Sequence, residues 1–385
     1  MRRVLSLLTA LAILMLCRAV LAEESAVYTP SWSSPYAGEA AGDYWTLPMD
    51  ITDEAAVWEA LMRPITVVTS KKSKPERRQL TLRAEPDAKS DGVGMVTCMT
   101  QGVRVLETLD NGWSLVECYS SSFKSSRVKY WNMLVRGYVE TERLKTITPS
   151  DAYGIVVDKL TQRLYLFKDG RLYSTLLVST GLANATQPYN ETRSGEFLLT
   201  SPVGAFPSGN LTCDMAIRFN AGDLLHEVPH IPGKYGRNYA YEEPKLGEKA
   251  SHGCIRVQRW KTPEGINMEW LWDNRQTYTR LFIWEDWQGR QIDVPPEDLT
   301  LYAEENGKTY HSQATCYAVE EGALEMTAFP YADLDSAAFQ NLTRCPACAP
   351  ALRRAEIEAI NARYAPGGDH DPVLTKAREK QLKRK

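Results

Sequence analysis

Most of this chain is built from short runs of β-branched and aromatic residues, and this pattern limits the folds open to it. The runs extend from Pro64 to about Val294, and turn signals such as Asp110-Asn111-Gly112 separate them. Typical runs are ITVVTS, QLTLRAEP, VRVLETL, WSLVECYS and VRGYVET. Short strands at this spacing predict sandwiches or barrels. We therefore expect a mainly β protein.

The first 22 residues have the features of a signal peptide. Two arginines precede an apolar run from Val4 to Leu16, and the small-residue end Val20-Leu21-Ala22 follows. Arg18 ends the apolar run well short of the roughly 20 residues that a membrane span needs. We expect cleavage after residue 22, a secreted protein of the cell wall or periplasm, and no membrane span in the mature chain.

Charge argues against a nucleic-acid partner. Loss of the leader would remove three arginines and no acidic residue, so the formal net charge would move from −3 to −6. Nucleic-acid binders instead present a basic face. Only the last ten residues, KAREKQLKRK, are strongly basic, and we expect them to be a solvated tail.

Changes in composition predict five segments. The signal peptide at 1–22 is followed by a linker at 23–63 rich in Ser, Pro, Tyr and acids, with one short helical pattern in TDEAAVWEALM. Two β-rich regions follow at 64–148 and 152–293, and a Cys- and His-containing appendage with a helix occupies 294–385. The sequence shows no internal repeat, phosphate loop or dinucleotide fingerprint.

The run KASHGCIRVQ carries the most specific chemistry in the sequence. Cys254 is a candidate nucleophile, and a cysteine attacks as its thiolate, so it needs a base or backbone N–H groups close by. The N–H groups of Gly253 and Cys254 could face a developing oxyanion. Arg256 follows at period-two spacing and could hold a carboxylate in a bidentate pair.

Three histidines are candidates for the base. His252 is two residues from Cys254, whereas His226 and His230 lie upstream in DLLHEVPH. In isolation, a buried structural thiol with a satisfied core histidine would be the better explanation of such a pair. The surrounding motifs make the nucleophile interpretation the stronger one.

Those motifs resemble the YkuD-type L,D-transpeptidase family over about residues 152–290. The resemblance rests on SHGCIRV and, in the expected order before it, on IVVDKLTQRLYLFKDG, VSTG, TRSGEF and FNAGDLLHEV. It implies a β-sandwich catalytic domain in which Cys254 is the nucleophile and His226 the base. It also implies that Ser251 and His252 shape the site, that Gly253 and Cys254 form the oxyanion hole, and that Arg256 supports the loop or reads a substrate carboxylate.

The sequence departs from the family pattern at three places. Glu227 follows the base where Gly, Ser or Thr is common, and Arg193 stands where the family usually has Pro. The segment between His226 and Ser251 is also longer than usual. We interpret its Tyr-rich part, residues 230–244, as a lid over the cleft, although a plain surface insertion explains it equally well.

The resemblance also implies a reaction. The donor is a peptidoglycan stem tetrapeptide, which Cys254 holds as a thioester until the side-chain amine of another stem accepts it, with no cofactor for catalysis. If water is the acceptor, the enzyme is an L,D-carboxypeptidase. A non-catalytic wall-binding protein is the alternative from another class.

Residues 64–148 resemble a bacterial SH3-type domain, a small barrel that usually binds cell-wall peptide or acts as a spacer. The resemblance rests on LRAEPDAKS, on DNGWSLVEC with its Trp113, and on VRGYVE. Cys98 and Cys118 lie on neighbouring candidate strands and could form a disulfide.

Seven cysteines remain after the leader, and the appendage holds three of them. His311 and Cys316 form H-x4-C, and Cys345 and Cys348 form C-x2-C, which together give the four ligands of a structural zinc site. The order of these residues loosely resembles small modules appended to some secreted nucleases. Disulfides that involve Cys213 are an equally good account in a secreted protein.

Overall fold

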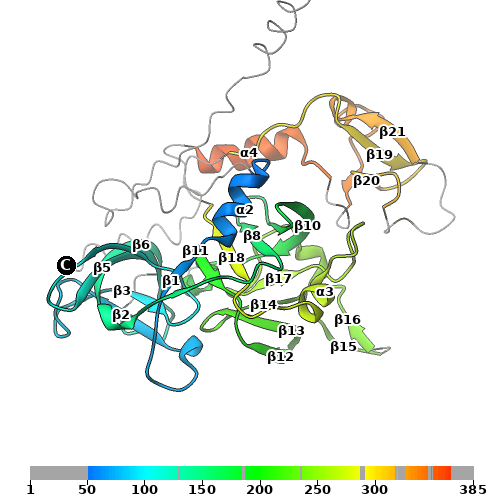
Figure 1. Ribbon diagram of the computed structural model, residues 1–385. Coiled ribbons are helices and arrows are strands. Elements are labelled where there is room, and N and C mark those ends of the chain that lie inside the picture. The colour runs from blue at the N-terminus through cyan, green and yellow to red at the C-terminus, as the bar shows by residue number, and fades with distance from the viewer. Residues whose placement is uncertain are drawn as a thin grey trace, which may run out of the picture.

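The computed structural model describes residues 51–128, 131–183, 187–234, 236–286, 291–316, 326–345 and 350–365, together with Val319 and Cys348. The predicted signal peptide, most of the predicted linker and the basic tail lie outside the described residues. Within the described ranges, no helix has the length and apolar character needed to cross a bilayer. Strands dominate, as predicted. Figure 1 shows a central sheet region, with an N-terminal sheet on one side and a C-terminal sheet on the other.

The central region is a nine-stranded sheet with the order β11-β18-β8-β9-β10-β17-β14-β13-β12. Two neighbouring pairs are parallel, β18 with β8 and β14 with β17, and the other pairs are antiparallel. The strands are β8 (Gly154–Asp158), β9 (Arg163–Lys168), β10 (Arg171–Ser179), β11 (Gly195–Leu198), β12 (Pro202–Ser208), β13 (Leu211–Asn220), β14 (Asp223–Glu227), β17 (Ile255–Val257) and β18 (Arg280–Trp284).

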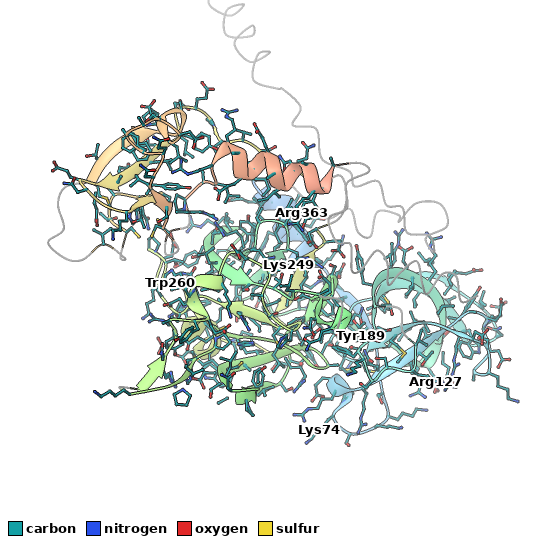
Figure 2. The ribbon with its side chains drawn as sticks, turned by 180° about the vertical axis from the view of Figure 1, so that it is seen from behind. Lys74, Arg127, Tyr189, Lys249, Trp260 and Arg363 are labelled. Atoms are coloured by element: carbon teal, nitrogen blue, oxygen red, sulfur yellow. The ribbon has the colours of Figure 1, made fainter. Side chains whose placement is uncertain are left out.

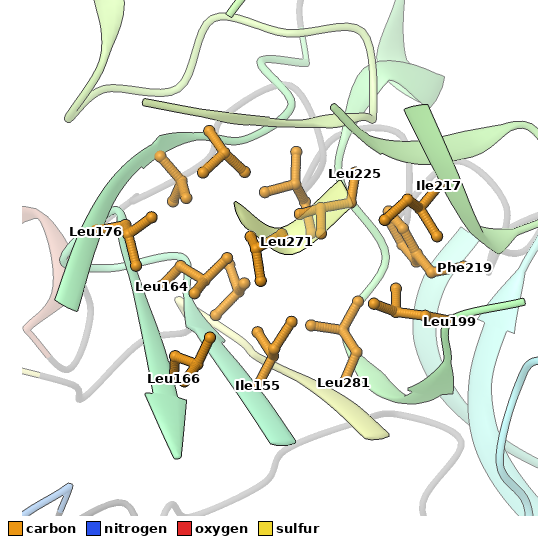
Figure 3. Packing of buried hydrophobic residues seen from close by; sticks show 14 of the residues in the cluster. Ile155, Leu164, Leu166, Leu176, Leu199, Ile217, Phe219, Leu225, Leu271 and Leu281 are labelled. Carbon is orange, nitrogen blue, oxygen red and sulfur yellow. The ribbon is translucent and has the colours of Figure 1, made fainter. Parts of the chain in front are cut away.

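The two halves of this sheet face each other across one apolar core. Figure 3 shows Ile155 and Leu164 from β8 and β9 facing Ile217 and Leu225 from β13 and β14. All four side chains are fully buried, and each contributes roughly 1.5–3 kcal/mol of burial free energy. The short helix α3 (Met268–Asp273) adds Leu271 to the same core. The core explains the sandwich that the sequence predicts for this region.

The helix predicted in the linker forms and packs against the central region. Helix α2 (Glu54–Met62) begins at Asp53, whose side chain accepts a hydrogen bond from the N–H of Ala56. Val57 and Leu61 of α2 pack on the outer face of β8, β9 and β18. The helix is therefore part of the folded unit that carries the candidate site.

The N-terminal region has its own sheet and its own core. Five antiparallel strands have the order β3-β2-β6-β5-β4, and a separate pair of strands, β1 with β7, flanks them. The strands are β1 (Ile65–Val68), β2 (Gln79–Arg83), β3 (Gly92–Thr97), β4 (Arg104–Thr108), β5 (Trp113–Ser121), β6 (Trp131–Glu140) and β7 (Leu144–Ile147). The SH3-like fold of this region stays a prediction. Cys98 and Cys118 are buried in its core as free thiols, and no disulfide joins them.

Backbone hydrogen bonds join the N-terminal sheet to the central one. The N–H of Gly102 donates to the Glu196 carbonyl, and the N–H of Leu198 donates to the Thr100 carbonyl. Both contacts lie on β11, the edge strand of the central sheet. Thr100 and Gly102 lie between β3 and β4, so this connection of the N-terminal region is held against the edge of the central sheet.

The C-terminal region forms a small sheet and one helix. Its four strands have the order β21-β19-β20-β22, and the predicted terminal helix is confirmed as α4. The elements are β19 (Thr300–Glu304), β20 (Thr309–His311), β21 (Met326–Pro330), β22 (Thr343–Arg344) and α4 (Arg354–Tyr364). Helix α4 reaches back to the central region, where the side chain of Asn361 bonds both the N–H and the carbonyl of Ile292.

Candidate functional site

The pairing of two parallel strands places the candidate base beside the strand that the candidate nucleophile directly precedes. In the pairing of β14 with β17, Leu225 lies beside Ile255 and His226 beside Arg256. Leu225 and Ile255 point into the core, so His226 and Arg256 point to the opposite face. Cys254 directly precedes β17, two residues before Arg256, and its thiol lies at the backbone N–H of Leu224 on β14. The predicted nucleophile therefore lies at the start of the strand that pairs with the strand of the predicted base.

The hydrogen bond that the His226 ring makes determines which of its two nitrogens carries the proton. Nδ1 lies 2.6 Å from the backbone carbonyl of Glu227, which only accepts, so Nδ1 must carry the hydrogen and Nε2 must be the basic nitrogen. Burial lowers the pKa of His226 to about 4, so the ring is neutral at pH 7. The imidazole also makes an edge-to-face contact with the Phe206 ring, with the two ring centroids 5.4 Å apart, and this contact helps to hold the orientation of the imidazole. His226 is thus prepared to accept a proton.

The thiol of Cys254 is protonated in this arrangement. Burial raises its pKa to about 12, and the charge of nearby Asp223 adds to the rise, whereas the N–H of Leu224 lowers it. The site therefore does not hold a preformed thiolate–imidazolium pair. A neutral imidazole must instead take the thiol proton as the sulfur attacks.

Glycine is required in the turn before the nucleophile. Gly253 has φ +119°, and a Cβ on it would lie 2.6 Å from Asp223 Oδ1. Its N–H donates to Ser251 Oγ at 3.2 Å, and Ser251 Oγ in turn donates to the Cys254 carbonyl. Ser251 therefore braces the turn from a buried position, while His252 is exposed to solvent. The N–H of Gly253, one of the two predicted oxyanion donors, is therefore already used in a hydrogen bond inside the turn.

Arg193 lies directly under this turn. In the sequence it stood out only as a departure from the family pattern. The side chain is 1% exposed, and its Nη1 is 3.3 Å from Asp223 Oδ2. Nη2 donates to the Ser122 carbonyl at 2.8 Å, and the guanidinium lies 4.0 Å from the centre of the Phe123 ring. Ser122 and Phe123 belong to the N-terminal region. That region therefore contributes to the support of the nucleophile turn.

A second buried ionic cluster supports the turn from the other side. Lys249, two residues before Ser251, pairs with Glu191 and Asp286, and Lys159 binds the same two carboxylates and Glu285. Asp286 and Glu191 raise the pKa of Lys249 well above its usual range, although burial opposes the rise. The three carboxylates could group around a metal ion, but the two ammonium groups already neutralise most of their charge.

The terminal helix contacts this cluster. The hydroxyl of Tyr364, the last residue of α4, donates to Asp286 Oδ2 at 2.9 Å. Figure 2 shows Lys249 beneath the helix that carries Arg363. A continuous set of contacts thus runs from the C-terminal helix through Asp286 and Lys249 to the nucleophile turn.

The long insertion before the nucleophile packs over the same surface. It contains the hairpin of β15 (Ile231–Gly233) and β16 (Gly236–Asn238). Glu242 from this segment accepts a bond from Arg256 Nη1 at 2.8 Å, so Arg256 holds the insertion in this structure. The carboxylate of Glu227 accepts a bond from the Tyr239 hydroxyl at 2.8 Å and not from His226. The imidazole is therefore oriented by the Glu227 carbonyl and not by its carboxylate.

His230, the rival base, lies outside this group. Its Nε2 is 3.0 Å from Asp214 Oδ2, and its backbone pairs with Thr212. It follows the end of β14 and does not face a residue of β17. Register and hydrogen bonding therefore favour His226.

The four residues of the predicted zinc site also come together, far from Cys254 in the chain. Their ligand atoms all lie within 4.8 Å of one another. No disulfide joins any of the cysteines that the structure describes. The group consists of His311, Cys316, Cys345 and Cys348.

A family comparison agrees with the geometry around Cys254. The segment 152–283 matches the model of the YkuD family, described as the L,D-transpeptidase catalytic domain. Residues 152–283 are a YkuD domain. The match covers about a third of the chain and includes His226, Ser251 and Cys254. No curated protein sequence matches the chain.

Similar solved structures are distant in sequence. A fused zinc-dependent amidase, peptidase and peptidoglycan-binding protein from Clostridium acetobutylicum is 19% identical, with a TM-score of 0.24 over 34% of this chain and 52% of its own. An L,D-transpeptidase from Xylanimonas cellulosilytica is 23% identical, with a TM-score of 0.26 over 35% and 61%. One from Mycobacterium tuberculosis is 16% identical, with a TM-score of 0.29 over 58% and 92%. The present chain thus spans little more than half of the first two structures, and beyond the YkuD domain its activity is a matter for proposal.

Proposed function

We propose that the protein is a secreted peptidoglycan L,D-transpeptidase in which Cys254 is the nucleophile and His226 is the general base. The observation that carries the proposal is the register of β14 with β17, together with the hydrogen bond from His226 Nδ1 to the Glu227 carbonyl. The first supports the pairing because it puts His226 on the strand beside the one that Cys254 directly precedes, and the second leaves Nε2 as the proton acceptor. The YkuD match supplies the class of reaction.

The first half-reaction forms a thioester. Cys254 Sγ attacks the carbonyl carbon of the third residue of a stem tetrapeptide, and His226 Nε2 takes the thiol proton as the S–C bond forms. The N–H of Cys254 is our assigned donor to the oxyanion. The C–N bond then breaks, and the terminal D-amino acid leaves with the proton that His226 returns to its nitrogen.

The second half-reaction regenerates the thiol. The side-chain amine of a second stem attacks the thioester carbonyl, loses a proton to His226, and forms the new amide as the S–C bond breaks. The proton then returns to sulfur. The thioester conserves the free energy of the cleaved bond, so the reaction needs no ATP and suits a compartment outside the cytoplasm.

Water is the competing acceptor, and its success would make the protein an L,D-carboxypeptidase. The insertion that Arg256 and Glu242 hold together supports transfer, because a covered site excludes water from the thioester. We propose that Arg256 binds this insertion and that Ser251 and Gly253 shape the turn. We also propose that His252, exposed beside Cys254, contacts the stem peptide.

The leader and the N-terminal region fit the same role. A cleaved signal peptide at residues 1–22 would deliver the protein to the cell wall or periplasm, and an SH3-like domain at 64–148 would hold it on wall peptide. A wall-binding protein without activity would not need a buried, oriented His226 on the strand beside the one that Cys254 directly precedes.

The test is product analysis with a defined substrate. A disaccharide tetrapeptide incubated with the protein should give a cross-linked dimer and one free D-amino acid for each bond formed, as measured by mass spectrometry. A Cys254→Ala variant should give neither. Tripeptide without dimer would establish the carboxypeptidase, and no turnover of either kind by the reduced wild type would refute the enzymatic proposal.

A further inference from the structure

The C-terminal region contains a compact group of soft ligands that the proposed reaction does not use. It comprises His311, Cys316, Cys345 and Cys348, and the first three are at most 2% exposed. The sheet brings them together from positions far apart in the chain. Because β20 pairs with β22 in parallel, with Tyr310 beside Arg344, His311 and Cys345 emerge next to each other at the same end of the two strands.

The separations between the ligand atoms are those of a tetrahedral metal site. The Sγ atoms of Cys316 and Cys345 lie 3.9 Å apart, and Cys348 Sγ lies 3.7 Å from His311 Nδ1. A tetrahedron with Zn–S bonds of about 2.3 Å and a Zn–N bond of about 2.0 Å has edges of about 3.8 Å between sulfurs and about 3.5 Å from sulfur to nitrogen. One ion at the centre would therefore reach both pairs with small adjustments.

Neighbouring polar groups orient the ligands as they do around structural metal ions. The Thr309 hydroxyl lies 2.9 Å from His311 Nε2, so the hydrogen bond falls on Nε2 and Nδ1 faces the sulfurs. The N–H of Ser312 donates to Cys348 Sγ at 3.3 Å. Such outer contacts fix the histidine ring and stabilise negative sulfur in metal sites.

The size of this region explains why it needs such a site. Among its described residues, the core cluster contains six buried apolar side chains, and β20 and β22 share two residue pairs. A unit with so small a core usually depends on a metal ion or on disulfides. The six core residues are Leu301, Ala303, Tyr310, Phe329, Tyr331 and Leu334.

We propose that His311, Cys316, Cys345 and Cys348 bind one structural Zn²⁺ ion. Three thiolates and one neutral imidazole complete four-coordinate zinc and leave no position for substrate, so the site is structural and not catalytic. Binding releases the thiol protons to solvent, and part of the binding free energy becomes folding free energy. The proposal does not depend on the activity proposed for Cys254.

A disulfide is the alternative account, and the geometry disfavours it. A disulfide requires about 2.05 Å between sulfurs, far less than the 3.9 Å between Cys316 and Cys345. A disulfide would also leave His311 without a reason to point Nδ1 at Cys348. Zinc uses all four side chains.

Metal analysis of the purified full-length protein tests the proposal. We expect one zinc ion for each chain by inductively coupled plasma mass spectrometry. Replacement by Co²⁺ should give the visible absorption of a tetrahedral thiolate complex. Cys345→Ser and His311→Ala should each lower the zinc content at least tenfold. Cys213→Ser, which removes a buried cysteine outside the group, should leave it unchanged.

Two results would overturn the proposal. One is metal-free protein from cells grown with added zinc that also fails to take up Co²⁺. The other is a disulfide between Cys316 and Cys345 found by peptide mapping without prior reduction. Because a variant could lose zinc by failing to fold, the acylation of Cys254 by a carbapenem is measured on each variant as a separate sign that the YkuD domain is folded.

Discussion

Replacement of Arg193 by methionine tests the support under the nucleophile turn. Arg193 forms a buried ion pair with Asp223, whose Oδ1 would lie only 2.6 Å from a Cβ on Gly253. Burial raises the pKa of Asp223 to about 6, although Arg193 lowers it. Methionine keeps much of the apolar volume of the side chain and removes the positive charge.

The expected loss of stability depends on pH. Asp223 is 3% exposed, and removal of one partner of a buried ion pair costs about 3–5 kcal/mol, so we expect this loss at pH 8, where the carboxyl is ionised. The folded pKa of Asp223 lies above its unfolded value, so protonation favours the folded state and the charge penalty disappears as the pH falls through the folded pKa. At pH 5 the loss should therefore be about 2 kcal/mol smaller, because only the bonds to backbone carbonyls are then missing.

Urea unfolding at pH 5 and pH 8 measures both values. The matched control is the double variant Arg193→Met with Asp223→Asn, which should recover part of the loss at pH 8, because no buried charge remains. An equal loss at the two pH values, or a double variant as unstable as the sum of the two single changes, would refute the reasoning.

Three further predictions concern the same site. Gly253→Ala should slow acylation of Cys254 about 100-fold, or ~2.7 kcal/mol, whereas Gly265→Ala, also at positive φ but with nothing within 4 Å of its Cβ, should leave the rate near wild type. Because burial lowers the pKa of His226 to about 4, the acylation rate should not fall as the pH is lowered from 8 to 5.5, and protonation of Asp223 near pH 6 should act in the other direction because its charge raises the pKa of the thiol. A fall toward low pH with a midpoint near 6.5 would contradict this assignment. Lys249→Met should destabilise the protein by about 3–5 kcal/mol in thermal or urea unfolding, because it leaves three buried carboxylates with one lysine. Tyr364→Phe removes one hydrogen bond to Asp286 and should destabilise the protein by only about 1 kcal/mol. Equal effects of the two variants would argue against the cluster.

Local patterns in the sequence predict much of this architecture. The turn at Lys168-Asp169-Gly170 joins β9 to β10, with Asp169 and Gly170 at positive φ, as a two-residue hairpin requires. Helices α2 and α4 lie within the segments whose apolar spacing predicts them. Motif order also picks out His226 and Cys254, and strand pairing brings the strand of His226 beside the one that Cys254 directly precedes.

The supports of the site could not be predicted, because they depend on contacts between residues distant in sequence. The motif TRSGEF marks Arg193 as unusual, but nothing in the sequence links it to Ser122 and Phe123 some seventy residues earlier. The sequence likewise marks Glu227 only as a departure from the family pattern. Its backbone carbonyl orients His226, whereas its side chain points to the other face, as expected for neighbours on a strand.

Intact-mass spectrometry of the protein after incubation with a carbapenem tests the central claim most directly. A β-lactam carbonyl can acylate Cys254 without a second substrate, so the experiment reports on the nucleophile alone. The account predicts one adduct on each wild-type chain and none on Cys254→Ala, with His226→Gln acylated at least 100-fold more slowly. A wild-type protein with reduced Cys254 that forms no adduct, or an adduct that persists in Cys254→Ala, would contradict it.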